Sequence, residues 1–293
     1  MEAIEVRNLR KTYGSKVAVE DVSFTVEQGE IFGVLGPNGA GKTTTVETIA
    51  GLRVADGGRV RVLGRDPADP ELRELVGVQL QDSALPDRLR VGEALELYAA
   101  FYRDPESPET LLAQLGLEQV RGTAFGKLSG GQRQRLSIAL ALVGGPRVAV
   151  LDELTTALDP QARRDTWELI EGVRSRGVTI LLVTHFMEEA ERLCDRVAVI
   201  DRGRVVALDS PGALGTLREQ RLRFRPSAPV EDALLLALDD VSAVEREGEL
   251  ILVSGGPAVV QNVAAALARD GIVAEGLRVE QANLEDAFVE LTK

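Results

Sequence analysis

The segment GPNGAGKTTT, residues 36–45, constrains the fold more than any other part of the chain. It follows a short apolar run, residues 31–35, whose lack of polar alternation is typical of a strand buried on both faces of a parallel sheet. Residues 43–50 then show a helical pattern that Gly51 ends. A strand, a glycine-rich loop and a helix in this order fit G-x-x-x-x-G-K-[ST], the pattern of a phosphate-binding loop.

The chemistry of this loop follows from its residue types. Glycine allows the backbone to wrap closely around phosphates with its N–H groups pointing inward. The helix that begins near Lys42 adds the positive end of its dipole. Lys42 can reach the β- and γ-phosphates of a nucleotide, and the Thr43 hydroxyl can ligate Mg²⁺. The plain alternative is an ordinary glycine-rich turn, which the complete pattern between a strand and a helix disfavours.

Two more apolar runs, residues 147–152 and 178–185, read as buried strands. Between them Asp159 can cap a helix and Pro160 can open it. Because strand, helix and strand repeat, the sequence predicts a parallel sheet covered by helices.

The secondary-structure pattern predicted from the sequence changes twice along the chain. From about residue 82 to residue 145 helical patterns dominate, which indicates a helical subdomain inserted into the α/β core. After Leu217 the order becomes β-α-β-β-α-β, which suits a small ferredoxin-like α+β domain closed by a last helix. We therefore expect an α/β domain at residues 1–217 and a second domain at residues 218–293.

Acidic and imidazole side chains stand at the ends of the predicted strands. Asp152 lies where a parallel strand delivers a side chain to the ligand crevice, where it could hold Mg²⁺. Glu153 follows and could act as general base on an attacking water. His185, the single histidine, comes at the same edge and could sense a γ-phosphate. The plain alternatives are a solvated acidic strand end and a satisfied polar residue.

Two other positions leave alternatives open. Tyr13 could stack on a base, although an aromatic residue so near the N-terminus is more often part of the core or surface. Gln79 and Gln81 are both candidates for contacting Mg²⁺ or its water. Because they lie two apart on a strand, they face the same side, and periodicity does not choose between them.

A second glycine-rich motif, LSGGQ, occupies residues 128–132. Ser129 and Gln132 fit the S-x-x-Q capping box of the following helix, which is a purely structural interpretation. A capped helix start also exposes N–H groups, and two glycines let a phosphate approach them. Both interpretations can hold together.

Composition excludes several classes of protein. The net charge of −12, from 46 acidic and 34 basic residues, argues against a general affinity for DNA or RNA. Cys194 is the only cysteine, which fits a reducing, cytoplasmic setting. The longest apolar runs fall short of the roughly 18 residues that suggest a transmembrane helix, so a membrane function requires another chain to supply the span.

Taken together, a set of features resembles the nucleotide-binding domain of an ABC transporter in order and spacing, over about residues 1–217: Tyr13, GPNGAGKT, Gln81, LSGGQ, VAVLDE at 148–153, ALD at 157–159 and His185. The resemblance implies ATP and Mg²⁺ as ligands and catalytic roles for Glu153, His185 and Gln81. It implies nucleotide contacts by Tyr13, Gly36, Pro37, Asn38, Gly39, Ala40, Gly41, Lys42, Thr43 and Thr44. It implies Mg²⁺ ligation by Thr43, Gln81 and Asp152. It also implies contacts to the nucleotide of a second copy by Ser129, Gly130, Gly131, Gln132 and Asp159.

The same resemblance predicts a P-loop NTPase that works as a homodimer and drives a separate membrane permease, at the inner face of the cell membrane. The ending LEDAFVELT is similar to that of the drug-resistance ATPases of bacterial export systems, which favours efflux of a drug or other small molecule. The stretch after Gln81, with Leu85, Leu89 and Val91, is the expected surface for the permease. One departure is Leu154, where the family usually has proline after the catalytic glutamate.

Two alternatives stay open at this point. A cytosolic ABC ATPase without a transport role would need extra basic surface or two linked ATPase halves, whereas this chain is acidic and has one set of motifs. For the C-terminal domain, regulation by a small ligand and passive dimerisation are equally compatible with the sequence.

Overall fold

The glycine-rich loop joins strand β3 (Ile31–Leu35) to helix α1 (Lys42–Ile49), as the sequence predicts. All residues of β3 are buried. Gly41 precedes the helix with φ of 104°, a conformation that favours glycine. A Cβ atom at this position would lie 2.5 Å from the Ala18 carbonyl oxygen. The last glycine of the loop is therefore required both by the backbone conformation and by the close approach of the neighbouring strand.

The computed structural model describes residues 1–80, 85–156, 158–216, 220–280 and 284–292. It contains two compact units, Met1–Asp209 and Ser210–Lys293. The first unit is built on a nine-stranded sheet of order β4-β1-β2-β9-β8-β3-β7-β6-β5. Its other strands are β1 (Glu2–Tyr13), β2 (Lys16–Glu27), β4 (Gly57–Val62), β5 (Val76–Gln79), β6 (Val148–Asp152), β7 (Thr179–Val183), β8 (Arg196–Asp201) and β9 (Arg204–Asp209).

The strands predicted to be parallel, β3, β6 and β7, are parallel, and the complete sheet is mixed because antiparallel strands extend it. Strands β8, β3, β7, β6 and β5 are parallel neighbours, whereas β1 pairs antiparallel with both β2 and β4. The long strands β1 and β2 are joined by the tight turn at Gly14 and Ser15, which a parallel connection would not allow. The α/β class itself is confirmed.

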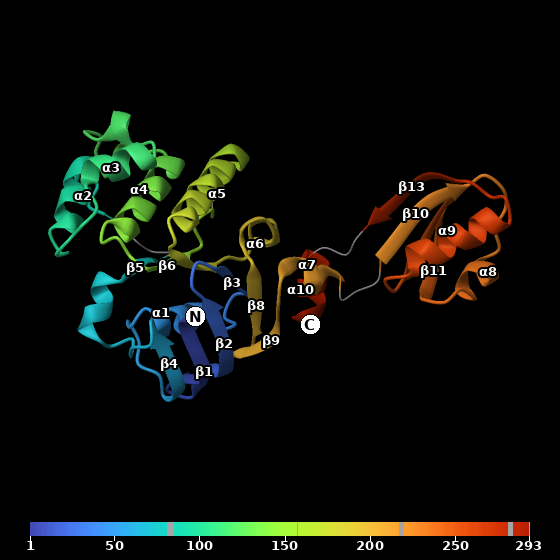
Figure 1. Ribbon diagram of the computed structural model, residues 1–293, viewed down its shortest axis with the longest axis horizontal. Coiled ribbons are helices and arrows are strands. Elements are labelled where there is room, and N and C mark those ends of the chain that lie inside the picture. The colour runs from blue at the N-terminus through green and yellow to red at the C-terminus, as the bar shows by residue number, and fades with distance from the viewer. Residues whose placement is uncertain (81–84, 157, 217–219, 281–283, 293) are drawn as a thin grey trace. The chain divides into compact units, whose positions relative to one another are not determined.

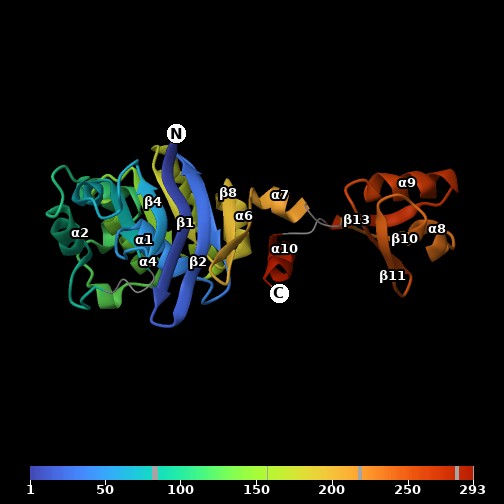
Figure 2. The same ribbon diagram turned by 90° about the horizontal axis from the view of Figure 1, so that it is seen from below.

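Helices of the first unit form a separate lobe and also flank the sheet (Figures 1 and 2). The lobe contains α2 (Val91–Ala99), α3 (Pro108–Gln114) and α4 (Gly130–Leu142). Helices α5 (Pro160–Ser175) and α6 (Met187–Leu193) follow β6 and β7. Short 3₁₀ turns lie at Pro70–Glu74, Glu118–Val120 and Phe125–Lys127. Among the described residues, no helix has the length and apolar character needed to cross a membrane.

The second unit has the β-α-β-β-α-β order that the sequence predicts. Its antiparallel sheet has the order β11-β12-β10-β13. Leu222, Phe224, Ile251, Val253 and Val263 lie in its apolar core. Its elements are α7 (Pro211–Thr216), β10 (Gln220–Pro226), α8 (Asp232–Leu236), β11 (Val241–Glu247), β12 (Leu250–Gly255), α9 (Val259–Arg269), β13 (Ala274–Glu280) and α10 (Leu284–Leu291).

The last helix differs from the sequence prediction. It does not simply close the ferredoxin-like unit, because α10 packs against α7 (Figure 1). Each helix contributes a buried leucine, Leu214 in α7 and Leu284 in α10. Along the chain, the boundary between the compact units lies between Asp209 and Ser210, whereas the sequence places it after Leu217, which lies outside the described residues.

We expect a chain that ends at Asp209 to fold by itself. The first unit has its own apolar core, so its Tm should stay within about 4 °C of the corresponding transition in the full chain. Thermal unfolding followed by circular dichroism measures this. Aggregation of the shortened chain would instead mean that both units share one core.

Candidate nucleotide-binding site

Three adjacent strands bring the predicted site residues to one edge of the sheet. The sheet places β7 between β3 and β6, and these strands are parallel. The phosphate-binding loop follows β3, Asp152 is the last residue of β6, and His185 comes shortly after β7. The carboxyl ends of parallel strands are where α/β sheets bind ligands. The geometry therefore gathers the loop, Asp152 and His185 as predicted.

Lys42 is buried at the start of α1. Its Nζ donates to the Gly36 carbonyl at 2.8 Å and to the Pro37 carbonyl at 3.1 Å. Burial lowers the pKa of Lys42, while the nearby Glu153 and Asp152 carboxylates act in the opposite direction. The ammonium group thus lies in the electrostatic field of both acids, inside the curve of the loop, where phosphates would replace the carbonyl partners.

Glu153 stands next to His185. The distance from His185 Nδ1 to Glu153 Oε1 is 3.4 Å. Glu153 has a φ of +48°, which is rare for a residue with a side chain and costs on the order of 1–3 kcal/mol. Its N–H donates to the Val183 carbonyl at 2.9 Å, which holds this conformation. Leu154, which stands where the family usually has proline, is fully buried. With leucine at this position, Glu153 still lies beside His185.

A threonine that the sequence interpretation did not single out shapes the turn at His185. Thr184 is fully buried, and its Oγ1 accepts a hydrogen bond from the Phe186 N–H at 3.0 Å. The Phe186 and His185 rings lie 4.1 Å apart between centroids. A threonine at the end of a strand commonly forms such a local turn, so the position of Thr184 directly after an apolar run could have indicated this turn.

Of the residues predicted to hold Mg²⁺, the structure describes Thr43 and Asp152. Asp152 is buried, and Thr43 is exposed on the first turn of α1. A hydroxyl and a carboxylate, completed by phosphate oxygens and water, are the donor set that Mg²⁺ prefers. Gln79 accepts a hydrogen bond from the Asp152 N–H at 3.1 Å and so ties β5 to β6. Gln81 lies outside the described residues.

Tyr13 ends β1 and keeps 42% of its surface exposed. The Lys11 ammonium lies 5.7 Å and the Arg53 guanidinium 6.0 Å from its ring centroid. An exposed ring can stack on a base, while the two cations beside it are paired with Asp56 and Glu47.

The LSGGQ motif starts helix α4 and has the capping box predicted for it. Ser129 Oγ accepts from the Gln132 N–H at 3.3 Å, and Gln132 Oε1 accepts from the Ser129 N–H at 3.0 Å. A pocket of about 450 Å³ joins this motif to Asp159. Asp159 caps α5 by accepting from the Gln161 and Ala162 N–H groups, which lowers its pKa. No residue of the phosphate-binding loop lines this pocket.

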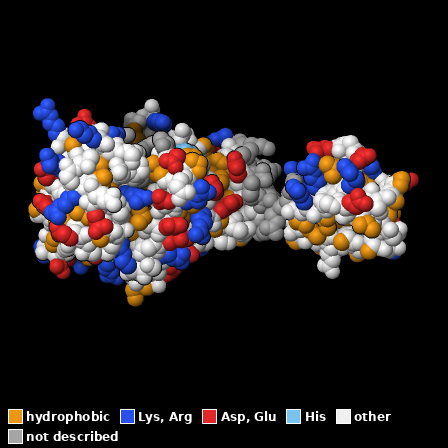
Figure 3. All heavy atoms as spheres, turned by 90° about the horizontal axis from the view of Figure 1, so that it is seen from above, with side chains coloured by type: hydrophobic (Ala, Val, Ile, Leu, Met, Phe, Trp, Pro, Cys, Tyr) orange, Lys and Arg blue, Asp and Glu red, His pale blue; other side chains and the backbone are white. Residues whose placement is uncertain are grey.

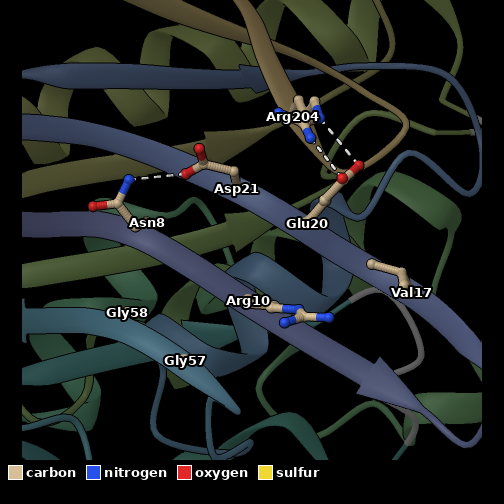
Figure 4. A pocket seen from close by; sticks show the side chains of 8 residues that line it. All are labelled: Asn8, Arg10, Val17, Glu20, Asp21, Gly57, Gly58 and Arg204. Carbon is tan, nitrogen blue, oxygen red and sulfur yellow. Dashed lines mark hydrogen bonds and ion pairs between the residues drawn. The ribbon is translucent and has the colours of Figure 1, made fainter.

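Another pocket, of about 480 Å³, lies on the antiparallel part of the sheet (Figure 4). In this pocket Arg204 donates to Glu20, and Asn8 donates to Asp21 (Figure 4). None of the predicted nucleotide-binding residues lines it. This pocket is therefore a solvated surface of the sheet, separate from the site described above.

Several known proteins resemble this chain in sequence and in fold. A model of the ABC transporter family matches residues 19–156. The Nod factor export ATP-binding protein I of Burkholderia orbicola (strain AU 1054) is 45% identical over 219 residues, covering 72% of each chain. CbiO1 from Clostridium perfringens, part of an ABC transporter complex, has a TM-score of 0.66 at 28% identity, covering 73% of this chain and 90% of that one. An ATP-binding cassette solved as a dimer with ADP and phosphate has a TM-score of 0.64 at 28% identity, covering 71% and 98%.

Proposed function

Because the chain belongs to the ABC transporter family, as an ATP-binding subunit of the kind that couples ATP hydrolysis to transport, we propose that it drives a separate membrane permease by dimerising on ATP. The ATP hydrolysis on which this proposal depends is supported by the gathering of Lys42, Glu153 and His185 at one sheet edge. The 45% identity with an ABC transporter ATP-binding protein over 72% of each chain confirms, at the level of the family, the resemblance inferred from the sequence.

In the proposed site the chain's own groups perform distinct tasks. Lys42 binds the β- and γ-phosphates, and Tyr13 stacks on the adenine. Glu153 accepts a proton from the attacking water, and His185 holds the γ-phosphate beside it. Mg²⁺, held by Thr43 and Asp152 together with the predicted Gln81, would neutralise charge on the phosphates.

Removal of Mg²⁺ tests the proposed chemistry. With excess EDTA, hydrolysis of ATP by the purified chain should fall to the background rate, because phosphate charge is then neutralised by Lys42 alone. Readdition of Mg²⁺ should restore the rate. Phosphate release measures both steps, and hydrolysis that persists in EDTA would exclude this site as the source of the activity.

The glycines of LSGGQ support a contact with a second copy. A Cβ atom on Gly130 would lie 3.6 Å from a Leu158 carbon, and one on Gly131 would lie 3.4 Å from the Ala162 Cβ. Both are ordinary contacts, so packing within one chain does not require glycine here. The exposed N–H groups of the α4 start are suited to a phosphate that arrives from outside. We assign that phosphate to ATP bound by the partner copy.

The proposed transport is export of a small organic molecule, with the cargo bound by the permease. The relatives named for Nod factor export support the direction of transport. A cytosolic ABC ATPase that acts on nucleic acid is less well supported, because acidic and basic side chains are interspersed over the face of the larger unit shown in Figure 3. The subunit would lie on the cytoplasmic face of the membrane through its permease.

The helical lobe offers a surface for this permease. The sequence interpretation placed Val91 on that surface, but Val91 is fully buried at the start of α2, because its side chain packs into the lobe. Leu97 and Phe101, at the other end of the same segment, are 48% and 71% exposed. We propose that these two residues, with the half-buried Leu89, contact the permease.

Phe101→Ser should weaken this contact without impairing ATP binding. Its ring is exposed, so the isolated chain should retain its Tm, while copurification with the proposed permease should decrease at least about tenfold. Val54→Ser is the matched control, since Val54 is 78% exposed and lies outside the helical lobe. Equal loss of copurification in both variants would contradict the assignment.

A further inference from the structure

One face of helix α5 contacts the segment that carries His185. Asp159 caps this helix, and Arg163 and Trp167 follow at intervals of four residues. Residues four apart lie one above the other on the same side of a helix. Asp159, which lines the LSGGQ pocket, therefore lies on the same face of α5 as Arg163 and Trp167.

Arg163 connects this face to His185 through an aromatic ring. Its guanidinium carbon lies 4.5 Å from the centroid of Phe186, a cation–π distance. The same ring lies 4.1 Å from the His185 ring. His185 in turn lies beside Glu153. A continuous set of contacts thus runs from α5 to the proposed catalytic pair.

Trp167 forms the second connection, one turn further along. Its Nε1 donates to Glu189 Oε1 at 3.0 Å. Glu189 belongs to α6, directly after the His185 turn, and its side chain is fully buried. Trp167, the only tryptophan of the chain, is nearly buried as well.

These contacts are costly if they serve packing alone. Among the described residues, Glu189 Oε2 and Arg163 Nε are buried without a hydrogen-bond partner, although another nitrogen of Arg163, Nη1, lies 3.7 Å from Glu188 Oε2. A buried carboxylate with half of its acceptors unused is less stable than an apolar pair of similar volume. Ordinary helix packing would favour leucine at the positions of Arg163 and Glu189. Packing alone therefore does not explain the directional hydrogen bond between Trp167 and Glu189.

We propose that Arg163, Trp167 and Glu189 are positioning residues that link the Asp159 end of α5 to the orientation of His185. In the proposed dimer, Asp159 and LSGGQ meet the nucleotide of the other copy. A displacement of α5 there would be passed through Phe186 and α6 to His185, so that each site becomes competent when the opposite site is occupied. This inference rests on the proposed ATPase function.

The test begins with Trp167→Phe, which keeps an aromatic ring and removes the N–H donor. We expect kcat to fall about 10- to 100-fold, because a small misplacement of a catalytic group has effects of this size, with KM for ATP within about twofold. Arg192→Gln is the matched control. The exposed Arg192–Glu171 ion pair, at 3.2 Å, joins the same two helices away from His185, and its loss should leave kcat unchanged.

A double variant separates positioning from stability. Trp167→Phe leaves Glu189 without its donor and should lower Tm, whereas Trp167→Phe combined with Glu189→Met removes both polar partners and should recover Tm. A positioning role predicts that kcat stays low in the double variant. Recovery of kcat together with Tm would overturn the proposal and show that the pair serves stability only.

Fluorescence of the single tryptophan provides a readout in the intact chain. Binding of Mg²⁺ and ATP should change the Trp167 emission in Glu153→Gln, and adding Ser129→Arg, which blocks the partner contact, should abolish the change. Emission that is insensitive to ATP in a chain that hydrolyses ATP would overturn the link while leaving the ATPase function intact. Absence of hydrolysis in the unmodified chain would instead refute the proposed function itself.

Discussion

Glu153→Gln is expected to lower the turnover of ATP by about 10²- to 10⁴-fold, the usual contribution of a general base. Glutamine keeps the size of the side chain and can remain beside His185, but it cannot accept the proton of the attacking water. The phosphate contacts of Lys42 are unaffected, so the affinity for ATP should be retained. The variant should therefore accumulate as a dimer with ATP bound, which size-exclusion chromatography with and without Mg²⁺ and ATP detects.

The control for this experiment is Glu168→Gln, the same chemical change at an exposed position on α5. It should retain full turnover and should not accumulate as a dimer with ATP bound. If Glu153→Gln kept steady-state turnover within a few-fold of the unmodified chain, Glu153 could not be the general base.

The nucleotide site was predictable because its determinants are local. The phosphate-binding loop depends on glycines at fixed spacing between a buried strand and a helix. Asp152 and His185 each follow an apolar run, and the ends of parallel strands meet at one edge whatever the order of the strands. The capping box of Ser129 likewise depends on residues only three positions apart.

Features that depend on tertiary packing were not predictable in this way. The burial of Val91 follows from how α2 packs in the helical lobe, and no periodicity within its short segment shows it. The contact of α10 with α7 joins segments separated by the whole ferredoxin-like sheet. The bond between Trp167 and Glu189 likewise needs the relative placement of two helices, which sequence spacing does not fix.

The second large effect is expected from mixing two inactive variants. Lys42→Ala removes the main positive charge on the β- and γ-phosphates, and Ser129→Arg fills the space where a phosphate would approach the start of α4. Each variant alone should lose at least about 10²-fold in hydrolysis, the effect of removing one group that stabilises the developing charge. In a homodimer of either variant, both nucleotide sites carry the lesion.

A mixed dimer differs if each site is completed by the partner copy. The Ser129→Arg chain still offers an intact phosphate-binding loop, and the Lys42→Ala chain still offers an intact LSGGQ. These two meet in one complete site, while the other site receives both lesions. If each chain instead used its own LSGGQ, both sites would be broken, and mixing would restore nothing.

Single-turnover hydrolysis of ATP by purified mixed dimers, carrying a different tag on each chain, tests this central claim most directly. The measurement should include the membrane subunit if dimer formation requires it. The proposed architecture predicts a recovered burst of phosphate from at most one of the two sites in each dimer, whereas neither parent variant gives a burst. Mixed dimers that form on ATP but release no more phosphate than either variant alone would contradict it.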